Sequence, residues 1–487
     1  MNPPGFLDLH RVLPEVVWCG IGVLLMLLQP FLKHRQALTF FAMIGTAVGT
    51  LASFFCFFGS GFSGLIQFDT FSLFFHLLIG LVAFLVILAS DSYLEREKLE
   101  PAEFYALILF ATVGMGVLAS AQELLTAFIG LEMSSISSYV LAGYRRDSIK
   151  SSESAVKYFL LGSFATAFFL YGIALIYGAT GSTNLAQLAN ANPSSMLLRL
   201  GLTLFLVGLG FKVAAAPFQV WTPDVYEGAP TPIAALFSAG PKAATFALLL
   251  RVFATLHAAT DFWFWAFWIL AALTMSVGNL GALVQRNIKR LLAYSSIAQA
   301  GYVLVAMAAV TFMKSTEGER PDAAYAAVLF YLLGYALVSV GAFTIVSEIG
   351  GHGERYNNIE DFAGLGTRQP FAAAALALFL LSLLGLPITA GFFGKFYVFK
   401  AAVHSHLIWL AVIMAVNSVI GAYYYLRVIV VMYMHEYKGT VPADAPTSLT
   451  PTGAMVVAVA MLATLYLGLA PNRVLDMVLS QDLILPR

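Results

Sequence analysis

Charged residues are scarce in this sequence. Lys, Arg, Asp and Glu together make up 11 % of the 487 residues, whereas a typical soluble domain carries roughly 25 %. Hydrophobic residues account for 60 % of the chain, and the mean hydropathy is +0.84. A soluble protein could not cover its surface with so few charges. The composition therefore excludes an ordinary cytosolic enzyme and indicates a protein that lies in lipid.

Cysteine and histidine are too few for several common kinds of site. The two cysteines, Cys19 and Cys56, both lie in apolar stretches, which excludes a CxxC metal site and a disulfide framework. Only His76 of the eight histidines lies clearly within an apolar run, whereas a bis-histidine haem needs two at matching depth. We therefore interpret His76 as a hydrogen-bonded interior residue. The net charge is zero without a long basic run, which argues against a nucleic-acid partner.

One glycine-rich motif matches a nucleotide-binding pattern in its letters only. Residues 59–64 read GSGFSG, which fits GxGxxG. A dinucleotide-binding loop needs a strand before it and a helix after it within a βαβ unit, whereas this motif follows a predicted membrane span. We therefore expect no dinucleotide site there.

Long apolar runs dominate the chain and predict an all-α polytopic membrane protein with about fourteen transmembrane helices, because each span needs about 20 mostly apolar residues. The connections are short, and the longest polar ones could not fold as a soluble domain of typical size. The predicted spans are 13–32, 38–58, 71–90, 104–120, 122–142, 153–178, 199–222, 232–255, 262–284, 290–310, 324–348, 372–403, 407–434 and 452–470.

Basic residues gather on one side of the predicted spans. Lys33 and Arg35 follow the first span, which places the N-terminus outside, and an even number of spans returns the C-terminus to the same side. The outer connections carry chiefly Lys314, Arg320, Arg473 and Arg487. The inner connections carry Lys33, Arg35, Arg96, Lys98, Arg145, Arg146, Lys150, Arg286, Lys289, Arg290, Arg355, Arg368 and Lys438.

Four ionisable residues lie deep within predicted spans: Glu132, Lys212, Lys242 and Lys395. A charge inside the bilayer costs several kcal/mol unless it is paired or hydrated. One acid cannot pair with three lysines, so at least two lysines must be neutral or hydrated by internal water. Because a desolvated lysine can release its proton near neutral pH, we favour a proton relay over structural ion pairing. Lys157 lies only a few residues into its span and is equally well interpreted as an interfacial lysine.

Two spans contain residues that break helices. Pro217 lies within 199–222, and Pro387 and Gly391 lie within 372–403. Broken backbone at membrane depth is tolerated where it lines a wet, protein-enclosed cavity. Each break lies within about two helical turns of a deep lysine, Lys212 or Lys395.

The positions of the breaks suggest an internal repeat. Spans 4–8 and 9–13 each contain five helices, and the broken helix is the fourth of each group. A five-span unit inverts between copies, so this arrangement predicts two inverted repeats with ion sites at the breaks. We divide the chain into a three-helix segment (1–100), a first repeat (101–258), a second repeat (259–436), and a final loop and span (437–487).

Five segments resemble the antiporter-like membrane subunits of respiratory complex I, the NADH-quinone oxidoreductase. The subunit N class, which includes mitochondrial subunit 2, is the most similar. Lysine at position 395 favours subunit N or L over subunit M, which typically has Glu there, and the lack of spans after the fourteenth disfavours subunit L. The segments are FKVAAAPFQVWTPDVYEGAP (211–230), GPKAATFALLLRV (240–252), NIKRLLAYSSIAQAGY (287–302), LPITAGFFGKF (386–396) and GAYYYLRV (421–428).

The resemblance implies a role for each deep charge. In that family the glutamate that matches Glu132 pairs with the lysine that matches Lys212. The lysine that matches Lys242 links two half-channels, and the one that matches Lys395 serves the periplasmic half-channel. Lys157 also matches a family lysine.

The sequence departs from the family at Gln219 and Gln299, where members often have His. Glutamine can hydrogen-bond water but cannot hold a proton. Either a water wire alone suffices at these two positions, or the central relay is tuned differently.

The resemblance implies a proton-translocating subunit of the bacterial inner membrane with both termini in the periplasm. Subunits K and M are its expected neighbours. The sequence shows no nicotinamide, flavin or iron–sulfur site, so we expect no cofactor on this chain and FMN and iron–sulfur clusters on its partners. The alternative is a subunit of a multisubunit cation/proton antiporter. A stand-alone solute transporter is disfavoured because both breaks carry mainly Ala, Gly and aromatic residues.

Overall fold

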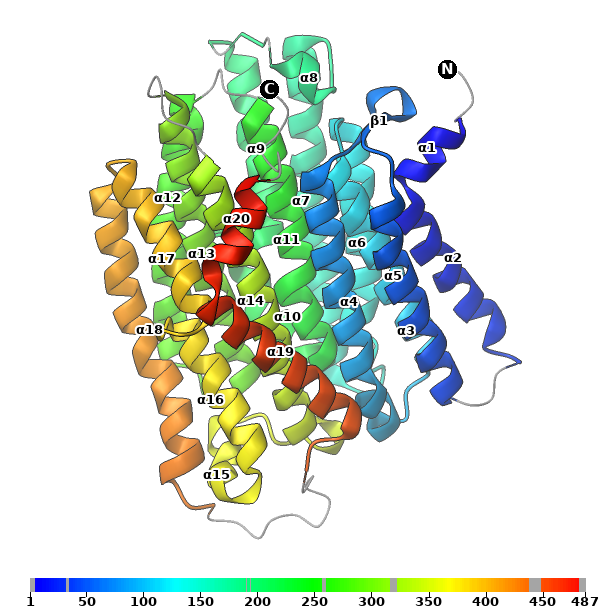
Figure 1. Cartoon of the computed structure of the whole chain (residues 1–487), viewed down its shortest axis with the longest axis vertical. Helices are drawn as coiled ribbons and strands as arrows, with labels where there is room; N and C mark the ends of the chain where they lie inside the picture. The colour runs from blue at the N-terminus through cyan, green and yellow to red at the C-terminus, as the bar shows by residue number, and fades with distance from the viewer. Residues whose placement is uncertain are drawn as a thin grey trace.

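The chain folds into one bundle of helices that stand roughly side by side (Figure 1). The computed structural model describes residues 5–31, 35–189, 191–192, 194–255, 260–315, 322–437 and 448–480. The only sheet in these ranges is an antiparallel hairpin of β1 (Gly59–Gly61) and β2 (Ile66–Phe68), in which Gly59 lies opposite Phe68. The GSGFSG motif therefore forms the first strand of this hairpin and the turn that follows it.

Twelve membrane-length apolar segments lie within the described ranges, which confirms the all-helical membrane class. Two shorter apolar helices, α2 (Leu13–Leu28) and α16 (Pro370–Leu384), lie where further spans are predicted. The total of fourteen and the inverted repeat stay predictions. The long helices are α3 (Arg35–Ala52), α4 (Thr70–Glu97), α5 (Pro101–Ser120), α6 (Leu124–Ala142), α7 (Ile149–Thr180), α9 (Met196–Val213), α11 (Thr231–Thr255), α12 (Thr260–Leu283), α13 (Ile288–Ser315), α14 (Asp322–Ile349), α18 (Ile408–Met434) and α19 (Pro451–Leu469).

Both predicted helix breaks are present. Helix α9 ends at Val213, four residues before Pro217, and the chain continues through η3 (Phe218–Trp221) into α10 (Thr222–Gly228). A residue before proline avoids the helical region, so the helix has to end upstream of it. Helix α16 ends at Leu384, where Gly385 takes a φ of 98° that suits glycine, and α17 (Ala390–His404) resumes the crossing.

Side chains also fix where helices begin. Helix α4 begins after Asp69, whose carboxylate accepts a 2.7 Å hydrogen bond from the backbone N–H of Ser72. Helix α6 begins after Glu123, which accepts a 2.6 Å hydrogen bond from the backbone N–H of Thr126. Such caps satisfy amide groups that the first helical turn leaves without partners.

The centre of the bundle is formed by α11, α13 and α14. Helix α11 is buried along its whole apolar length and packs against α4, α5 and α14. Helices α7, α12 and α18 expose apolar side chains, as a face toward lipid or a partner requires. Helix α19 runs obliquely over α14, α17 and α4 (Figure 1).

The two ends of the bundle differ in charge. Helices α1 (Phe6–Arg11) and α8 (Leu185–Leu188) lie at the upper end in Figure 1, and α15 (Leu365–Arg368) lies at the lower end. The α6–α7 connection and the segment between α14 and α16, which carry many of the basic residues, are at the lower end. Helix α20 (Pro471–Ser480) ends the described chain. Of the residues used to predict orientation, Lys33, Arg320, Lys438 and Arg487 lie outside the described residues.

Candidate functional site

Glu132 and Lys212 lie around one aromatic pair. Glu132 of α6 accepts a 2.8 Å hydrogen bond from the hydroxyl of Thr166. Lys212, in the last turn of α9 and 7 % exposed, has its Nζ 5.3 Å and 5.4 Å from the ring centroids of Tyr139 and Tyr158. Desolvated cation–π contacts of this kind are worth about 2 kcal/mol. Within the described residues the two charges form no direct salt bridge, and Tyr139 belongs to the same helix as Glu132 and contacts Lys212.

Lys242 lies at the centre of the bundle on α11 and is 2 % exposed. Its Nζ donates to the carbonyl oxygen (2.8 Å) and the hydroxyl oxygen (2.9 Å) of Ser296 on α13. An ammonium has three N–H donors, and no carboxylate pairs with this one in the described part of the chain. One N–H is therefore available for a further acceptor.

Lys395 caps the helix that the break interrupts. Its Nζ donates a 3.0 Å hydrogen bond to the carbonyl oxygen of Leu384, the last residue of α16, and lies 4.6 Å from the ring centroid of Tyr302. The carbonyls at a helix end lack helical partners and carry partial negative charge. The break therefore supplies an acceptor for this half-buried lysine.

Gln299 joins α13 to α14, α16 and α18. Its Nε2 donates to the carbonyl oxygen of Leu383 (3.1 Å) and the hydroxyl of Tyr425 (3.2 Å), and its Oε1 accepts a hydrogen bond from the hydroxyl of Tyr331. Gln299 is 3 % exposed. Gln299 thus lies one helical turn after Ser296 on α13. The Leu383 carbonyl that it binds is next along the chain to the Leu384 carbonyl that binds Lys395.

A small cavity lies beside Gln299 at the break. Its wall includes Gln299, Tyr335, Ser382 and Gly391, and its room for the centre of a water molecule is about 10 Å³, roughly the space of one water. A Cβ on Gly391 would lie 1.8 Å from the carbonyl oxygen of Ser382. Glycine is therefore required where α17 starts against α16.

The remaining residues of the breaks lie nearer the surface. Pro217 and Pro387 are exposed, so they end helices while their rings face away from the bundle interior. Gln219 is half-buried, and its Oε1 is buried without a hydrogen-bond donor among the described residues.

Lys157 belongs to an ion network at the lower end. Its Nζ lies 2.5 Å from Asp224 and 2.6 Å from Glu153, and its side chain is 40 % exposed. Asp224 and Glu227 of α10 also bind Arg290 of α13, at 2.5 Å and 3.0 Å. These contacts favour the interfacial interpretation of Lys157 and join the segments before and after the α11–α12 connection.

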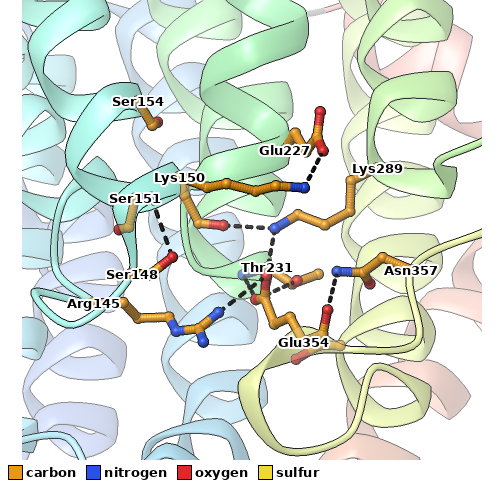
Figure 2. Close-up of polar contacts among 12 residues, drawn as sticks. Arg145, Ser148, Lys150, Ser151, Ser154, Glu227, Thr231, Lys289, Glu354 and Asn357 are labelled. Atoms are coloured by element: carbon orange, nitrogen blue, oxygen red, sulfur yellow. Dashed lines mark hydrogen bonds and ion pairs between the residues drawn. The ribbon is translucent and has the colours of Figure 1, made fainter.

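Glu354 is the centre of a second cluster at the lower end, shown in Figure 2. Its side chain is 5 % exposed and lies 2.8 Å from the Nζ of Lys289, whose side chain is fully buried, and 3.5 Å from Arg145. It also accepts hydrogen bonds from the backbone N–H (2.9 Å) and hydroxyl (2.7 Å) of Thr231 at the start of α11. Burial alone would raise the pKa of Glu354, but Lys289, Arg145 and Thr231 hold that pKa below its ordinary value of 4.5.

Sequence reasoning missed these partners of Glu354 and a third cluster at the upper end. Arg251 of α11, 1 % exposed, makes two hydrogen bonds to the carboxylate of Asp69, at 3.1 Å and 2.7 Å. A single arginine inside the apolar run 244–253 was the signal that could have found it. His76 is hydrogen-bonded in the interior, as predicted, and its partner is Glu15.

Comparison with known proteins defines the family. The model of the family described as NADH:quinone oxidoreductase/Mrp antiporter, TM, matches residues 121–421. The chain belongs to this family. The resemblance inferred from the five segments is thereby confirmed.

Relatives within this antiporter-like family match the chain over nearly its whole length. A protein named NADH-quinone oxidoreductase subunit N 2 from Koribacter versatilis is 50 % identical and covers 98 % of this chain and 98 % of its own. A protein named NADH-quinone oxidoreductase subunit N from Trichlorobacter lovleyi is 45 % identical, with 96 % of each chain covered.

Solved structures of the family share the fold. A chain of respiratory complex I from Thermus thermophilus with bound aureothin is 37 % identical, with a TM-score of 0.80 over 96 % of this chain and 100 % of that one. A chain of the Mrp complex from Dietzia has a TM-score of 0.81 at 21 % identity over 98 % of this chain and 96 % of that one. At that identity the second likeness concerns the fold alone.

Proposed function

We propose that this chain is a proton-translocating subunit, of the subunit N class, in a bacterial NADH-quinone oxidoreductase. Its relatives named subunit N support the assembly, and its buried lysines support the chemistry. In this proposal redox reactions on partner subunits supply the energy, and this chain moves the protons. Moving one proton against 100 mV needs about 2.3 kcal/mol, which is within the ~3–5 kcal/mol that breaking a buried ion pair involves.

The observation that carries this proposal is a row of polar groups between the buried Lys242 and the half-buried Lys395. Lys242 binds Ser296, and Gln299 follows Ser296 by three residues, on the same face of α13. Gln299 binds the carbonyl of Leu383, and the next carbonyl along the chain binds Lys395. Hydrogen-bonding groups therefore lie at several points between Lys242 and Lys395.

Glu132 and Lys212 would load this line from the first half of the chain. Lys212 contacts the ring of Tyr139, which belongs to the same helix as Glu132, and Lys212 lies at the end of a broken helix, as Lys395 lies beside one. A change in the charge of Glu132 would alter how firmly Lys212 holds its proton. Lys157, Asp224 and Glu153 at the lower end would exchange protons with the inner solution.

The distribution of basic residues supports an orientation in the bacterial inner membrane with the lower end of the bundle in the cytoplasm. Both termini would then lie on the periplasmic side. Subunits K and M are the neighbours we expect within the membrane, and FMN and iron–sulfur clusters would be carried by the redox arm.

Substitution of Lys395 tests the proposal. The assembled complex is reconstituted into liposomes, and NADH-driven acidification is measured for Lys395→Arg and Lys395→Ala. Arginine can still donate to Leu384 but does not release its proton, so both variants should pump less although only one loses the charge. Lys400→Ala is the matched control, because Lys400 is an exposed lysine five residues later on the same helix. Normal pumping by Lys395→Arg would show that Lys395 acts as a fixed charge and not as a carrier.

The second candidate function is a subunit of a cation/proton antiporter, which the description of the matching family also includes. The same lysines would serve it without redox chemistry. Purification of the native assembly separates the two candidates, because only the oxidoreductase contains iron–sulfur proteins.

A further inference from the structure

A buried acid–imidazole pair lies outside the proposed proton path. Nε2 of His76 on α4 lies 2.6 Å from Oε1 of Glu15 on α2, and these residues are 0 % and 5 % exposed. The other ring nitrogen, Nδ1, lies 2.7 Å from the carbonyl oxygen of Ser72. A carbonyl oxygen can only accept, so Nδ1 carries a hydrogen. One further proton is then shared between Nε2 and Oε1.

Two aromatic rings and a glycine surround the Glu15–His76 pair. The ring of Trp18 stacks on His76 with centroids 6.1 Å apart, and Phe68 lies 5.3 Å away. A Cβ on Gly116 of α5 would lie 2.7 Å from Oε1 of Glu15 and 3.1 Å from Nε2 of His76, so only glycine leaves the pair its space. The second carboxylate oxygen, Oε2 of Glu15, is buried and has no donor among the described residues. It is therefore free to bind an additional proton.

Polar residues lie between this pair and the upper end of the bundle. The hydroxyl of Ser72, whose carbonyl binds His76, accepts a 2.6 Å hydrogen bond from Arg251. Arg251 also binds Asp69, whose side chain is 20 % exposed. Arg251 lies on α11 nine residues after Lys242, about 14 Å along the helix. The pair thus lies near an ion pair that reaches the solution at that end and that belongs in part to the helix carrying Lys242.

We propose that Glu15 and His76 form a buried proton-exchange site that equilibrates with the periplasmic solution, which makes turnover sensitive to periplasmic pH. This inference rests on the proposed function and its orientation. In the resting state the pair shares one proton and is neutral overall. Uptake of a second proton from the solution, onto Oε2 of Glu15, leaves imidazolium and neutral carboxyl with one net positive charge. Release to the same solution restores the neutral pair.

The charges around the pair determine what its protonation does. Arg251 faces it from α11, Asp69 from the start of α4, and the Cys56 thiol from the segment after α3, while α5 contributes only Gly116. A second positive charge beside Arg251 raises the potential at the periplasmic end of α11. Further protons then arrive there less readily, so an acid periplasm slows discharge.

The variant Glu15→Gln tests whether this pair exchanges protons. A glutamine amide can donate to Nε2 of His76 while Nδ1 keeps its bond to Ser72, so the geometry is retained and the exchangeable proton is removed. The assembled complex is placed in liposomes, and NADH in the medium drives only molecules whose redox arm faces outward. The lumen is then the periplasmic side, and its pH is varied while valinomycin and K⁺ abolish the membrane potential.

We expect wild-type NADH turnover to fall about fivefold as the lumen is acidified from neutral pH, at the lower end of typical coupling between two sites. Glu15→Gln should keep its turnover at neutral pH and lose this response. Glu103→Gln, the same change near the other end of the bundle, should respond as wild type. A full response in Glu15→Gln would overturn the proposal.

A second measurement does not depend on pumping. The infrared spectrum of the purified complex should contain a carboxyl band that grows on acidification and is missing in Glu15→Gln and shifted in His76→Gln. An unchanged spectrum in both variants would refute the site itself. Absence of any NADH turnover would refute the proposed function, and the infrared band would still decide the exchange site.

Discussion

Glu354→Gln gives the most quantitative test of how the lower end is held together. Glutamine keeps an oxygen that can accept from Thr231 but removes the negative charge beside Lys289 and Arg145. Because the Lys289 side chain is fully buried, its charge would remain in the interior with only the carbonyl oxygen of Ala229, 2.7 Å away, as a described acceptor. Removing one partner of a buried ion pair lowers the free energy of unfolding by about 3–5 kcal/mol, and we expect Glu354→Gln to lose this amount.

The double variant separates the ion pair from other effects. Replacing both members of a buried pair by uncharged residues is often neutral, so Glu354→Gln with Lys289→Met should recover most of the loss. The two substitutions should couple by about 2 kcal/mol, within the range for residues in contact. Additive losses would contradict this interpretation of the contact between Glu354 and Lys289.

Heat inactivation provides the assay. Large assemblies unfold irreversibly, so the half-life of the intact complex on native gels at one raised temperature is the appropriate quantity. Glu360→Gln is the control, because Glu360 is an exposed acid of the same connection. A Glu354→Gln complex with a wild-type half-life would refute the reasoning.

The difference in half-life between wild type and Glu354→Gln should change with pH in a defined direction. The pKa of Glu354 is held below its ordinary value of 4.5, so its ionised form stabilises the folded state. That stabilisation is complete above the ordinary value and is lost as the pH falls through the lowered pKa. The advantage of wild type over Glu354→Gln should therefore stay constant near neutral pH and shrink in acid.

Three further substitutions test the transport path. Gln299→His should shift the pH profile of pumping between about pH 6 and 8, where imidazole changes charge; an unchanged profile would place Gln299 off the path. Gly391→Ala should reduce the amount of this chain in purified complex, because its Cβ would lie 1.8 Å from the carbonyl oxygen of Ser382; normal assembly would contradict that requirement. Lys157→Met should lower pumping less than Lys395→Ala, because the Lys157 side chain is 40 % exposed and water can replace it; an equal loss would place Lys157 within the essential relay.

The sequence predicts features of the fold that depend on local composition. Apolar runs of membrane length indicate the spanning helices, and Pro217 and Pro387 indicate the two broken ones. The sequence does not predict the exact path of the backbone through each break. Helix α9 ends at Val213, whereas the predicted span continued to residue 222, because the proline acts on the residues before it and the following segment folds into η3 and α10.

The partners of the deep charges could not be predicted. Burial of Lys242 and Lys395 follows from their positions in apolar runs, but their acceptors are brought to them by other helices. Ser296 lies 54 positions after Lys242, and the acceptor of Lys395 is a backbone carbonyl that no side-chain pattern marks. The partners of Glu354 are likewise distant in sequence, because they come from the α6–α7 connection and from the starts of α11 and α13.

The ion pairs at the lower end also restrict the kind of motion available to transport. Transporters built from repeats commonly expose their sites alternately by rocking one bundle of helices against the other. Here Arg290 binds both Asp224 and Glu227, and Lys289 donates to the carbonyl oxygen of Ala229, so the segments before and after the α11–α12 connection are joined at one end. A rocking motion would have to break these ion pairs and this hydrogen bond in every transport cycle. The contacts instead favour transport in which side chains rotate and protons move between them while the helices keep their positions.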